Sequence, residues 1–154
     1  MPSLEFRCSL DAPIAKVWEF HDSIETLFLL TPPNTTATLD GRPEPMREGV
    51  IYKLKLKRWG ILPLPTWHAK IVVYCPPTRF EDEQIPGKGP FKAWHHTHRF
   101  EEVDATHTLL IDEVTYTPPF GILGEIADAL LIRRDIEKMF AYRHEVTKRE
   151  LAKK

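Results

Sequence analysis

The sequence predicts an α+β fold in which one long C-terminal helix covers a curved antiparallel sheet. Three observations predict it. Apolar residues alternate with a period of two between Thr35 and Thr117, turn residues divide that region into short segments, and the period changes to about 3.6 residues after Pro118-Pro119. Short connections between consecutive strands favour antiparallel hairpins. A sheet with one apolar face needs a cover, and only the last helix is long enough to provide it.

The N-terminal part of the chain is expected to contain one strand and two short helices. The helices break near His21-Asp22-Ser23 and end at Thr31-Pro32-Pro33, because a residue before proline disfavours the helical conformation. Alternating apolar residues indicate the strand, and apolar residues at helical spacing indicate the helices: Leu4, Phe6, Cys8 and Leu10, then Ile14, Val17, Trp18 and Leu27.

Further strands follow, and each is expected to point a mixture of apolar and polar side chains toward one face of the sheet. Turn chemistry separates them at Asp40-Gly41, Pro76-Pro77, Gly87–Pro90 and Asp104-Ala105. The residues expected to share a face are Tyr52, Leu54 and Leu56; Trp67, Ala69, Ile71 and Val73; Phe80, Asp82 and Gln84; Trp94, His96, His98 and Phe100; and Leu110, Asp112, Val114 and Tyr116.

The apolar spacing after Pro118-Pro119 predicts a single amphipathic helix that continues to near Leu151. A helix of roughly 28 residues is about 42 Å long, so a twisted sheet can curl around it without touching its full length. We therefore expect a cavity between sheet and helix, within one domain that spans residues 1–154. The helix is marked by Ile122, Ile126, Leu130, Ile136, Met139, Phe140 and Val146.

Composition argues against several classes of partner. The chain has 154 residues and a net charge of −1 with acidic and basic residues interspersed, so it lacks the basic face that nucleic-acid binding requires. Its apolar runs are too short for a membrane span, and the segment after Met1 lacks a signal-peptide pattern. The two cysteines, Cys8 and Cys75, form neither a disulfide framework nor a CxxC pair. These features predict a cytoplasmic protein.

An ordered set of short motifs also runs through the chain. It consists of Asp11-Ala12-Pro13 with Val17-Trp18; Leu30–Pro33; Phe80–Gln84; Gly89-Pro90-Phe91; Trp94 with His96, His98 and Phe100; Asp112-Glu113-Val114 with Tyr116; and Pro119-Phe120-Gly121. The set resembles the START-like (SRPBCC) superfamily, which includes polyketide cyclases and the birch-pollen allergen, and within it an uncharacterised bacterial subgroup. The resemblance spans nearly the whole chain and implies a helix-grip fold. It does not select a function, because the superfamily contains carriers, receptors and cyclases.

The leading functional hypothesis is a protein that binds a small hydrophobic or amphipathic molecule, lipid-, polyketide- or isoprenoid-like, in that cavity. A closed core seldom tolerates many unpaired polar groups, whereas a ligand pocket combines apolar walls with a few placed polar groups. The alternative is that the polar groups satisfy one another, or pair with Arg99 and Arg143. No cofactor is expected. The candidate ligand-binding residues are Tyr52, Leu54, Leu56, Trp67, Phe80, Gln84, Trp94, His96, His98, Phe100, Asp112, Val114, Tyr116, Ile126, Leu130 and Met139.

Two histidines are also candidates for chemistry. His96 and His98 lie two residues apart on one strand face, with Asp112 on the next strand. These three candidate catalytic residues could move protons on a ketone, as in the aromatases, cyclases and dehydratases that the resemblance suggests. They could also chelate zinc, but neither a further ligand nor a supporting group stands out, so no metal site is expected. The chain lacks a recognisable catalytic motif, which favours binding over catalysis.

Two apolar loops are expected to form the entrance to the cavity, Trp59–Pro65 and Pro118–Gly124. Exposed apolar loops mark ligand mouths or protein contacts, and the alternative is that the two loops pack on each other. A third hypothesis is therefore a protein-interaction module that uses this apolar rim. Both a monomer and a homodimer are compatible with the sequence.

Overall fold

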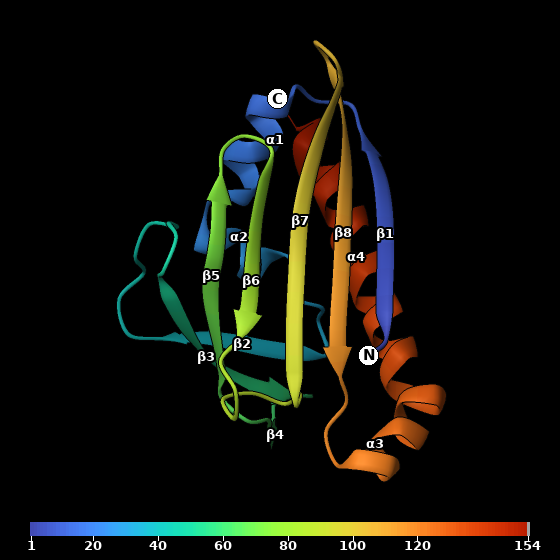
Figure 1. Cartoon of the computed structure of the whole chain (residues 1–154). Helices are drawn as coiled ribbons and strands as arrows, with labels where there is room; N and C mark the ends of the chain where they lie inside the picture. The colour runs from blue at the N-terminus through green and yellow to red at the C-terminus, as the bar shows by residue number, and fades with distance from the viewer. Residues whose placement is uncertain (154) are drawn as a thin grey trace.

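The computed structural model describes residues 1–153, and its elements follow the predicted order (Figure 1). The strands are β1 (Ser3–Leu10), β2 (Thr35–Asp40), β3 (Ile51–Arg58), β4 (Leu62–Pro63), β5 (Trp67–Cys75), β6 (Arg79–Gln84), β7 (Ala93–Asp104) and β8 (His107–Thr117). The helices are α1 (Ile14–His21), α2 (Ile24–Leu29), α3 (Gly121–Ala127), a π-helical segment η1 (Asp128–Ile132) and α4 (Arg133–Ala152).

The strands form one 8-stranded sheet in the order β1-β8-β7-β6-β5-β3-β2, with the short β4 paired to β3 outside this path. Every pairing along this order is antiparallel. Figure 1 shows β2 and β3 lying across the other strands, so that the sheet curls. The predicted α+β fold with a curved antiparallel sheet is confirmed.

Helices α1, α2 and α4 lie on the same side of the sheet (Figure 1). Two apolar clusters lie between them and the strands. In one, Trp18 of α1 packs edge-to-face against Phe80 and Phe100, with ring centroids 5.9 and 5.8 Å apart. In the other, Phe140 of α4 stacks on Phe6 of β1 at 4.6 Å. Burying each of these large side chains stabilises the fold by about 1.5–3 kcal/mol.

The helical region after β8 differs from the single helix predicted by the sequence. The segment η1 interrupts it, and a π turn holds an additional residue, which shifts the helical register. Apolar positions before η1 therefore point in a different direction from those after it. Ile126 and Leu130 are 55% and 67% exposed, which corrects the expectation that both face the interior.

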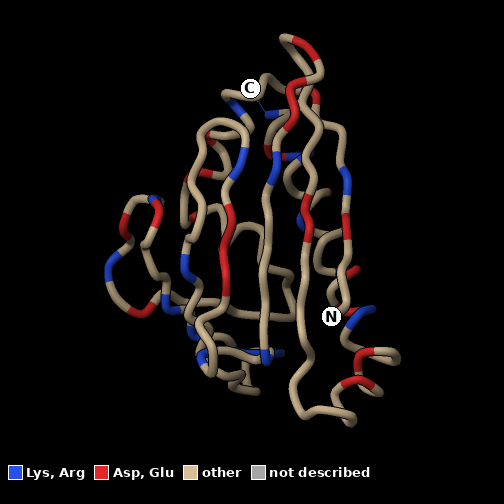
Figure 2. Tube along the Cα trace, viewed as in Figure 1, with Lys and Arg blue, Asp and Glu red and all other residues tan. Residues whose placement is uncertain are grey.

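The surface carries charges of both signs. Figure 2 shows acidic and basic residues spread over strands and helices rather than gathered on one face in this view. Within residues 1–153, no helix combines the length and apolar character needed to cross a membrane. Of the two cysteines, Cys8 is buried in β1 and Cys75 is exposed at the end of β5.

Candidate functional site

Three histidines and two aspartates meet in the interior of the protein. Strands β6, β7 and β8 are neighbours, and their register places Asp82 opposite His96, and His98 opposite Asp112. His96 and His98 share the inner face because side chains two residues apart on a strand point to the same side. Helix α4 brings His144 into contact with this group. We call these five residues the His/Asp cluster.

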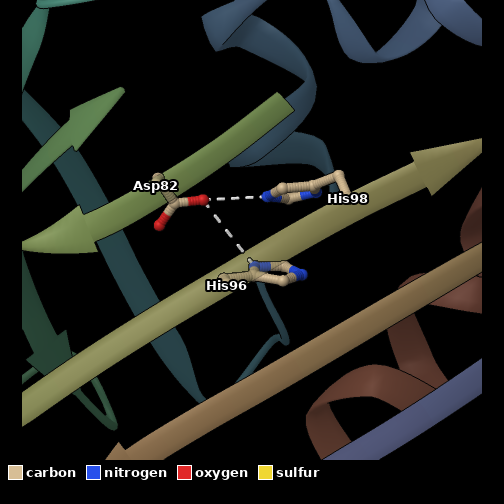
Figure 3. Close-up of side chains that lie close together, drawn as sticks. All are labelled: Asp82, His96 and His98. Carbon is tan, nitrogen blue, oxygen red and sulfur yellow. Dashed lines mark hydrogen bonds and ion pairs between the residues drawn. The ribbon is translucent and has the colours of Figure 1, made fainter. Parts of the chain in front are cut away.

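Asp82 lies beside both strand histidines (Figure 3). Its Oδ2 accepts a hydrogen bond from His98 Nε2 at 2.8 Å and lies 3.8 Å from His96 Nδ1. The two imidazole centroids are 3.6 Å apart. Ligand-type atoms of the three residues all lie within 4.8 Å of one another, so one carboxylate and two imidazoles converge on a small volume that could hold a metal ion.

Asp112 supports the histidines from another side. Its Oδ1 accepts a hydrogen bond from His96 Nε2 at 2.7 Å and lies 3.5 Å from His98 Nδ1. Its Oδ2 accepts a hydrogen bond from His144 Nε2 at 2.6 Å. One buried carboxylate therefore orients three imidazoles.

Burial and pairing set the charges of the cluster. Burial, and then the neighbouring His96, lower the pKa of His98 to about 3, so its imidazole is neutral near pH 7. Burial alone would raise the pKa of Asp112, but hydrogen bonds from His144 and His96 outweigh it and hold that pKa well below its ordinary value. Burial also opposes ionisation of Asp82, but the hydrogen bond from His98 and the neighbouring charges lower its pKa. Both carboxylates are therefore ionised.

Arg143 on α4 adds one cation beside the cluster. Its guanidinium lies over the ring of Phe140, 5.4 Å from the centroid. Burial lowers the pKa of Arg143, and the charges of Asp112 and Asp82 oppose that shift, which places the guanidinium within reach of their field. Among residues 1–153, no carboxylate oxygen comes within 4.0 Å of its nitrogens. The cation therefore lacks a direct ion-pair partner within the described chain.

Most of the expected ligand-binding residues lie in the interior, but their polar atoms are largely paired. Gln84 Nε2 donates to the Phe91 carbonyl at 2.6 Å, and the Phe91 amide donates back to Gln84 Oε1 at 3.2 Å. The Tyr116 hydroxyl donates to Asp128 at 2.5 Å. Leu56, Trp67 and Met139 are half-buried, and the buried members are Tyr52, Leu54, Phe80, Gln84, Trp94, His96, His98, Phe100, Asp112, Val114 and Tyr116.

Trp67 is the exception, because it keeps an unused donor. Its indole Nε1 is buried and has no hydrogen-bond partner among the described residues. The ring packs against Phe91 and Trp94, with centroids 5.8 and 5.2 Å away. Leaving a buried donor unpaired costs about 1–3 kcal/mol. Arg58 Nε is also buried without a partner, although its guanidinium lies 3.5 Å from Asp135 of α4.

The two apolar loops remain exposed. Phe120 and Ile61 are 84% and 83% exposed, so burial against each other does not account for these side chains. The contact between Arg58 and Asp135 brings the end of β3 to the start of α4. We call the exposed loop residues the apolar rim: Trp59, Ile61, Leu62, Phe120, Ile122 and Leu123.

Two hollows in the surface lie away from both the cluster and the rim. One, of about 390 Å³, is lined by α2 and β2 and includes Ile24, Phe28 and Leu39. The other, of about 640 Å³, includes Ile14 and Arg79. Neither lies between the sheet and α4, where the sequence predicts a cavity.

Three residues of the site were not among the sequence candidates. The alternation in β6 predicts the strand face of Asp82 but not its role, Arg143 is predicted only as a possible ion-pair partner, and none of the sequence motifs includes His144. His144 follows Phe140 by about one helical turn, which was the available signal. Their meeting depends on the β6–β7 register and on the docking of α4, which no local pattern contains.

Comparisons with known proteins agree on the fold. A profile of the family described as "Domain of unknown function (DUF8410)" matches residues 8–151. Protein CV1439 from Chromobacterium violaceum aligns over 100% of both chains, with a TM-score of 0.77 and 12% identity. Ara h 8.0201 aligns over 97% of each chain, with a TM-score of 0.63 and 12% identity.

A nucleoside-diphosphate sugar epimerase from Corynebacterium glutamicum aligns with 96% of this chain but 29% of its own, with a TM-score of 0.69 and 21% identity. A search of curated proteins finds no match to the sequence. These structural likenesses confirm the START-like helix-grip fold that the sequence motifs indicate.

Proposed function

The chain belongs to the DUF8410 family, and we propose that it binds a small hydrophobic or amphipathic molecule, lipid-, polyketide- or isoprenoid-like, between the sheet and the C-terminal helices. The observation that carries this proposal is the unpaired indole N–H of Trp67 inside an aromatic wall. Buried donors in native proteins nearly always have a partner, and a bound ligand would provide one.

Two donor groups indicate what the ligand carries. The Trp67 indole N–H only donates hydrogen bonds and has no acceptor among the described residues, and the guanidinium of Arg143, another donor-only group, lies beside the His/Asp cluster. The polar part of the ligand is therefore expected to present acceptor oxygens, as a carboxylate or carbonyl does. Phe91, Trp94 and Met139 would contact its apolar part.

The apolar rim supports a route into the interior. Large apolar side chains that stay exposed together often mark a ligand mouth. The two surface hollows lie elsewhere, and we expect a ligand to enter by an outward movement of α3 and η1. A π-helical segment is a suitable hinge, since its hydrogen-bond geometry is less regular than that of an α-helix and such segments are frequent at functional sites.

A thermal-shift experiment tests the proposal. Delipidated protein is mixed with dodecanoate, farnesol or a hydroxylated polycyclic aromatic ketone. A ligand present at about 100 times its Kd stabilises the folded state by about 2.7 kcal/mol, which raises the Tm by several degrees. Trp67→Phe keeps an aromatic ring, although a smaller one, but removes the donor and should weaken the shift, whereas Trp59→Phe on the exposed rim should not remove it. Unchanged Tm values for all three probes, with no copurifying molecule by native mass spectrometry, would refute the proposal.

The geometry supports binding better than proton-transfer catalysis by His96, His98 and Asp112. A general base needs an imidazole nitrogen within reach of the substrate. Both nitrogens of His96 lie 2.7 and 3.8 Å from carboxylate oxygens, and both nitrogens of His98 lie 2.8 and 3.5 Å from them. These nitrogens face the protein's own side chains.

The exposed rim also favours a second candidate, a protein-interaction surface. Its six residues leave two loops with large apolar side chains at the surface. Leu62→Glu and Phe120→Glu should then change the elution volume in size-exclusion chromatography while leaving ligand-induced thermal shifts intact. If the elution volume is unchanged, this second function loses its support.

A further inference from the structure

We propose that Asp82, His96 and His98 form a binding site for a divalent transition-metal ion of the Zn²⁺ or Fe²⁺ type. This inference goes beyond small-molecule binding and is independent of it. The sequence favoured no metal site, because it revealed neither a third ligand besides Asp112 nor a group that supports the histidines. The structure provides both, and it also changes the ligand set.

The donor atoms converge on one volume, and the two separations from the Asp82 carboxylate are close to those of a coordination site (Figure 3). Two ligand atoms on a tetrahedral ion with bonds of about 2.0–2.1 Å lie about 3.3 Å apart. Asp82 Oδ2 lies 2.8 Å from His98 Nε2 and 3.8 Å from His96 Nδ1. Both separations differ from the required value by about half an ångström. A small side-chain adjustment therefore admits an ion, which replaces the hydrogen bond between Asp82 and His98.

The groups behind the histidines are those that metal sites use. A metal-bound histidine almost always donates its other ring N–H to a carboxylate, which fixes the ring and raises its basicity. His96 presents Nδ1 to Asp82 and donates from Nε2 to Asp112 at 2.7 Å. His98 presents Nε2 to Asp82, and its Nδ1 lies 3.5 Å from the same Asp112 oxygen. His144 Nε2 in turn donates a hydrogen bond to Asp112 Oδ2 at 2.6 Å.

The charges suit a divalent cation. The two carboxylates of the cluster outnumber the single guanidinium of Arg143 beside them. Metal ligation requires an unprotonated ring nitrogen, so His98 would carry its proton on Nδ1, which faces Asp112 Oδ1 at 3.5 Å, and would ligate through Nε2. Two imidazoles and one carboxylate form the set that non-haem iron and zinc sites share, with at least one further position for water or a bound molecule.

The site is rigid but reachable. All three ligands stand on adjacent strands of the sheet, which hold side chains more precisely than loops do. The side chains of His96 and His98 are 3% and 8% exposed, whereas that of Asp82 is 17% exposed. Asp82 therefore lies on the side from which an ion can enter.

Cobalt provides a direct test, because Co²⁺ in such a site has visible absorption bands. Chelator-treated protein is titrated with Co²⁺ and followed by absorbance and calorimetry, and the bound Co²⁺ is then displaced with Zn²⁺. We expect one ion per chain. Asp82→Asn preserves the shape of the side chain and should weaken Co²⁺ binding by at least about 10-fold.

His95 provides a matched control. It is the next residue on β7 but points to the other face, where its nitrogens contact Glu81 and Glu83 at 2.7 and 2.9 Å. His95→Ala should change Co²⁺ affinity by less than about 2-fold, since a surface histidine with flexible carboxylates is a poor competitor for the buried set.

The outcome does not depend on the variants alone. Circular dichroism shows whether Asp82→Asn is folded. If the variant is unfolded, the proposal is tested instead by whether Zn²⁺ raises the Tm of the wild-type protein. Folded wild-type protein that takes up no stoichiometric Co²⁺ or Zn²⁺ would overturn the site, as would equal loss of binding in His95→Ala. No organic ligand is present, so this result is separate from the test of small-molecule binding.

Discussion

Asp112 is the shared acceptor of the polar network in the protein interior. It accepts hydrogen bonds from two histidines and neighbours a third. Breaking a buried charged network by changing one partner costs about 3 kcal/mol, because the remaining groups stay buried without their acceptor. We expect Asp112→Asn to lower the free energy of unfolding by about 3 kcal/mol, measured by urea denaturation.

The adjacent residue is the control for this substitution. Glu113 points to the outer face, is 40% exposed and pairs with Arg99. Exposed ion pairs contribute about 0–1 kcal/mol. Glu113→Gln should therefore change the free energy of unfolding by less than about 1 kcal/mol. Equal effects of the two substitutions would show that the interior network is not energetically special.

We expect the free energy of unfolding to depend on pH because two histidines are buried in their neutral form. Burial is the main cause that lowers the pKa of His98 to about 3, and it also lowers that of His21, which donates to the Val17 carbonyl, to about 4. Both folded-state values lie below the unfolded value of about 6.5, so the unfolded state binds more protons between these limits. Their stabilising contribution is therefore complete above about pH 6.5 and is lost as the pH falls.

Urea denaturation in the presence of chelator measures this dependence. Around pH 5, unfolding should take up about two protons at these histidines, which corresponds to about 2.7 kcal/mol of lost stability per pH unit. His98→Gln should remove about half of that slope. The lowered pKa values of Asp82 and Asp112 act in the same direction at lower pH. A stability that stays flat from pH 7 to pH 5 contradicts this assignment of neutral buried histidines.

Among the elements, the connection from β8 into α3 leaves no room for a side chain at Gly124. A Cβ on Gly124 would lie 1.6 Å from the carbonyl oxygen of Pro119, which belongs to the backbone and cannot rotate away. Gly124→Ala is therefore expected to displace the start of α3 and to cost about 2 kcal/mol or more, within the range for overpacking. Urea denaturation measures the cost, and circular dichroism follows the helix content.

Substitution of Gly60 is the control that measures backbone strain at a position with free space around it. Its φ is +71°, but a Cβ there would meet nothing within 4 Å. Gly60→Ala should cost about 1–2 kcal/mol, from the left-handed conformation alone. If Gly124→Ala costs less than Gly60→Ala, the close approach of α3 to Pro119 is not a real constraint.

The same elements show where sequence patterns succeed and fail. The alternation in β7 and β8 and the tight turn between them were sufficient to place His98 and Asp112 on one face, and the register sets the two residues opposite each other. The break at η1 was not predicted, because apolar residues continue through it and a π turn has no strong sequence pattern. The direction of Ile126 and Leu130 was wrong for this reason.

At the scale of the whole molecule, the fold followed from the order of periodicities, but the site did not. The position of Asp82 depends on the β6–β7 register, which is set across a long connection rather than a tight turn. The positions of His144 and Arg143 depend on how α4 docks across the sheet. Such long-range placements are decided by total packing and carry no local pattern, so sequence reasoning recovered the strand histidines but not the groups that surround them.

The central claim is that the interior accepts an amphipathic ligand next to Trp67. The most direct measurement is a ¹H–¹⁵N spectrum of the indole N–H groups while delipidated protein is titrated with dodecanoate, farnesol or the aromatic ketone. Trp67→Phe assigns the Trp67 resonance, and Trp18, which packs in the other apolar cluster, is the internal reference. We expect a saturable shift of the Trp67 resonance with little change at Trp18. A Trp67 resonance that moves no more than that of Trp18 with every probe, in a protein that stays folded, would contradict it.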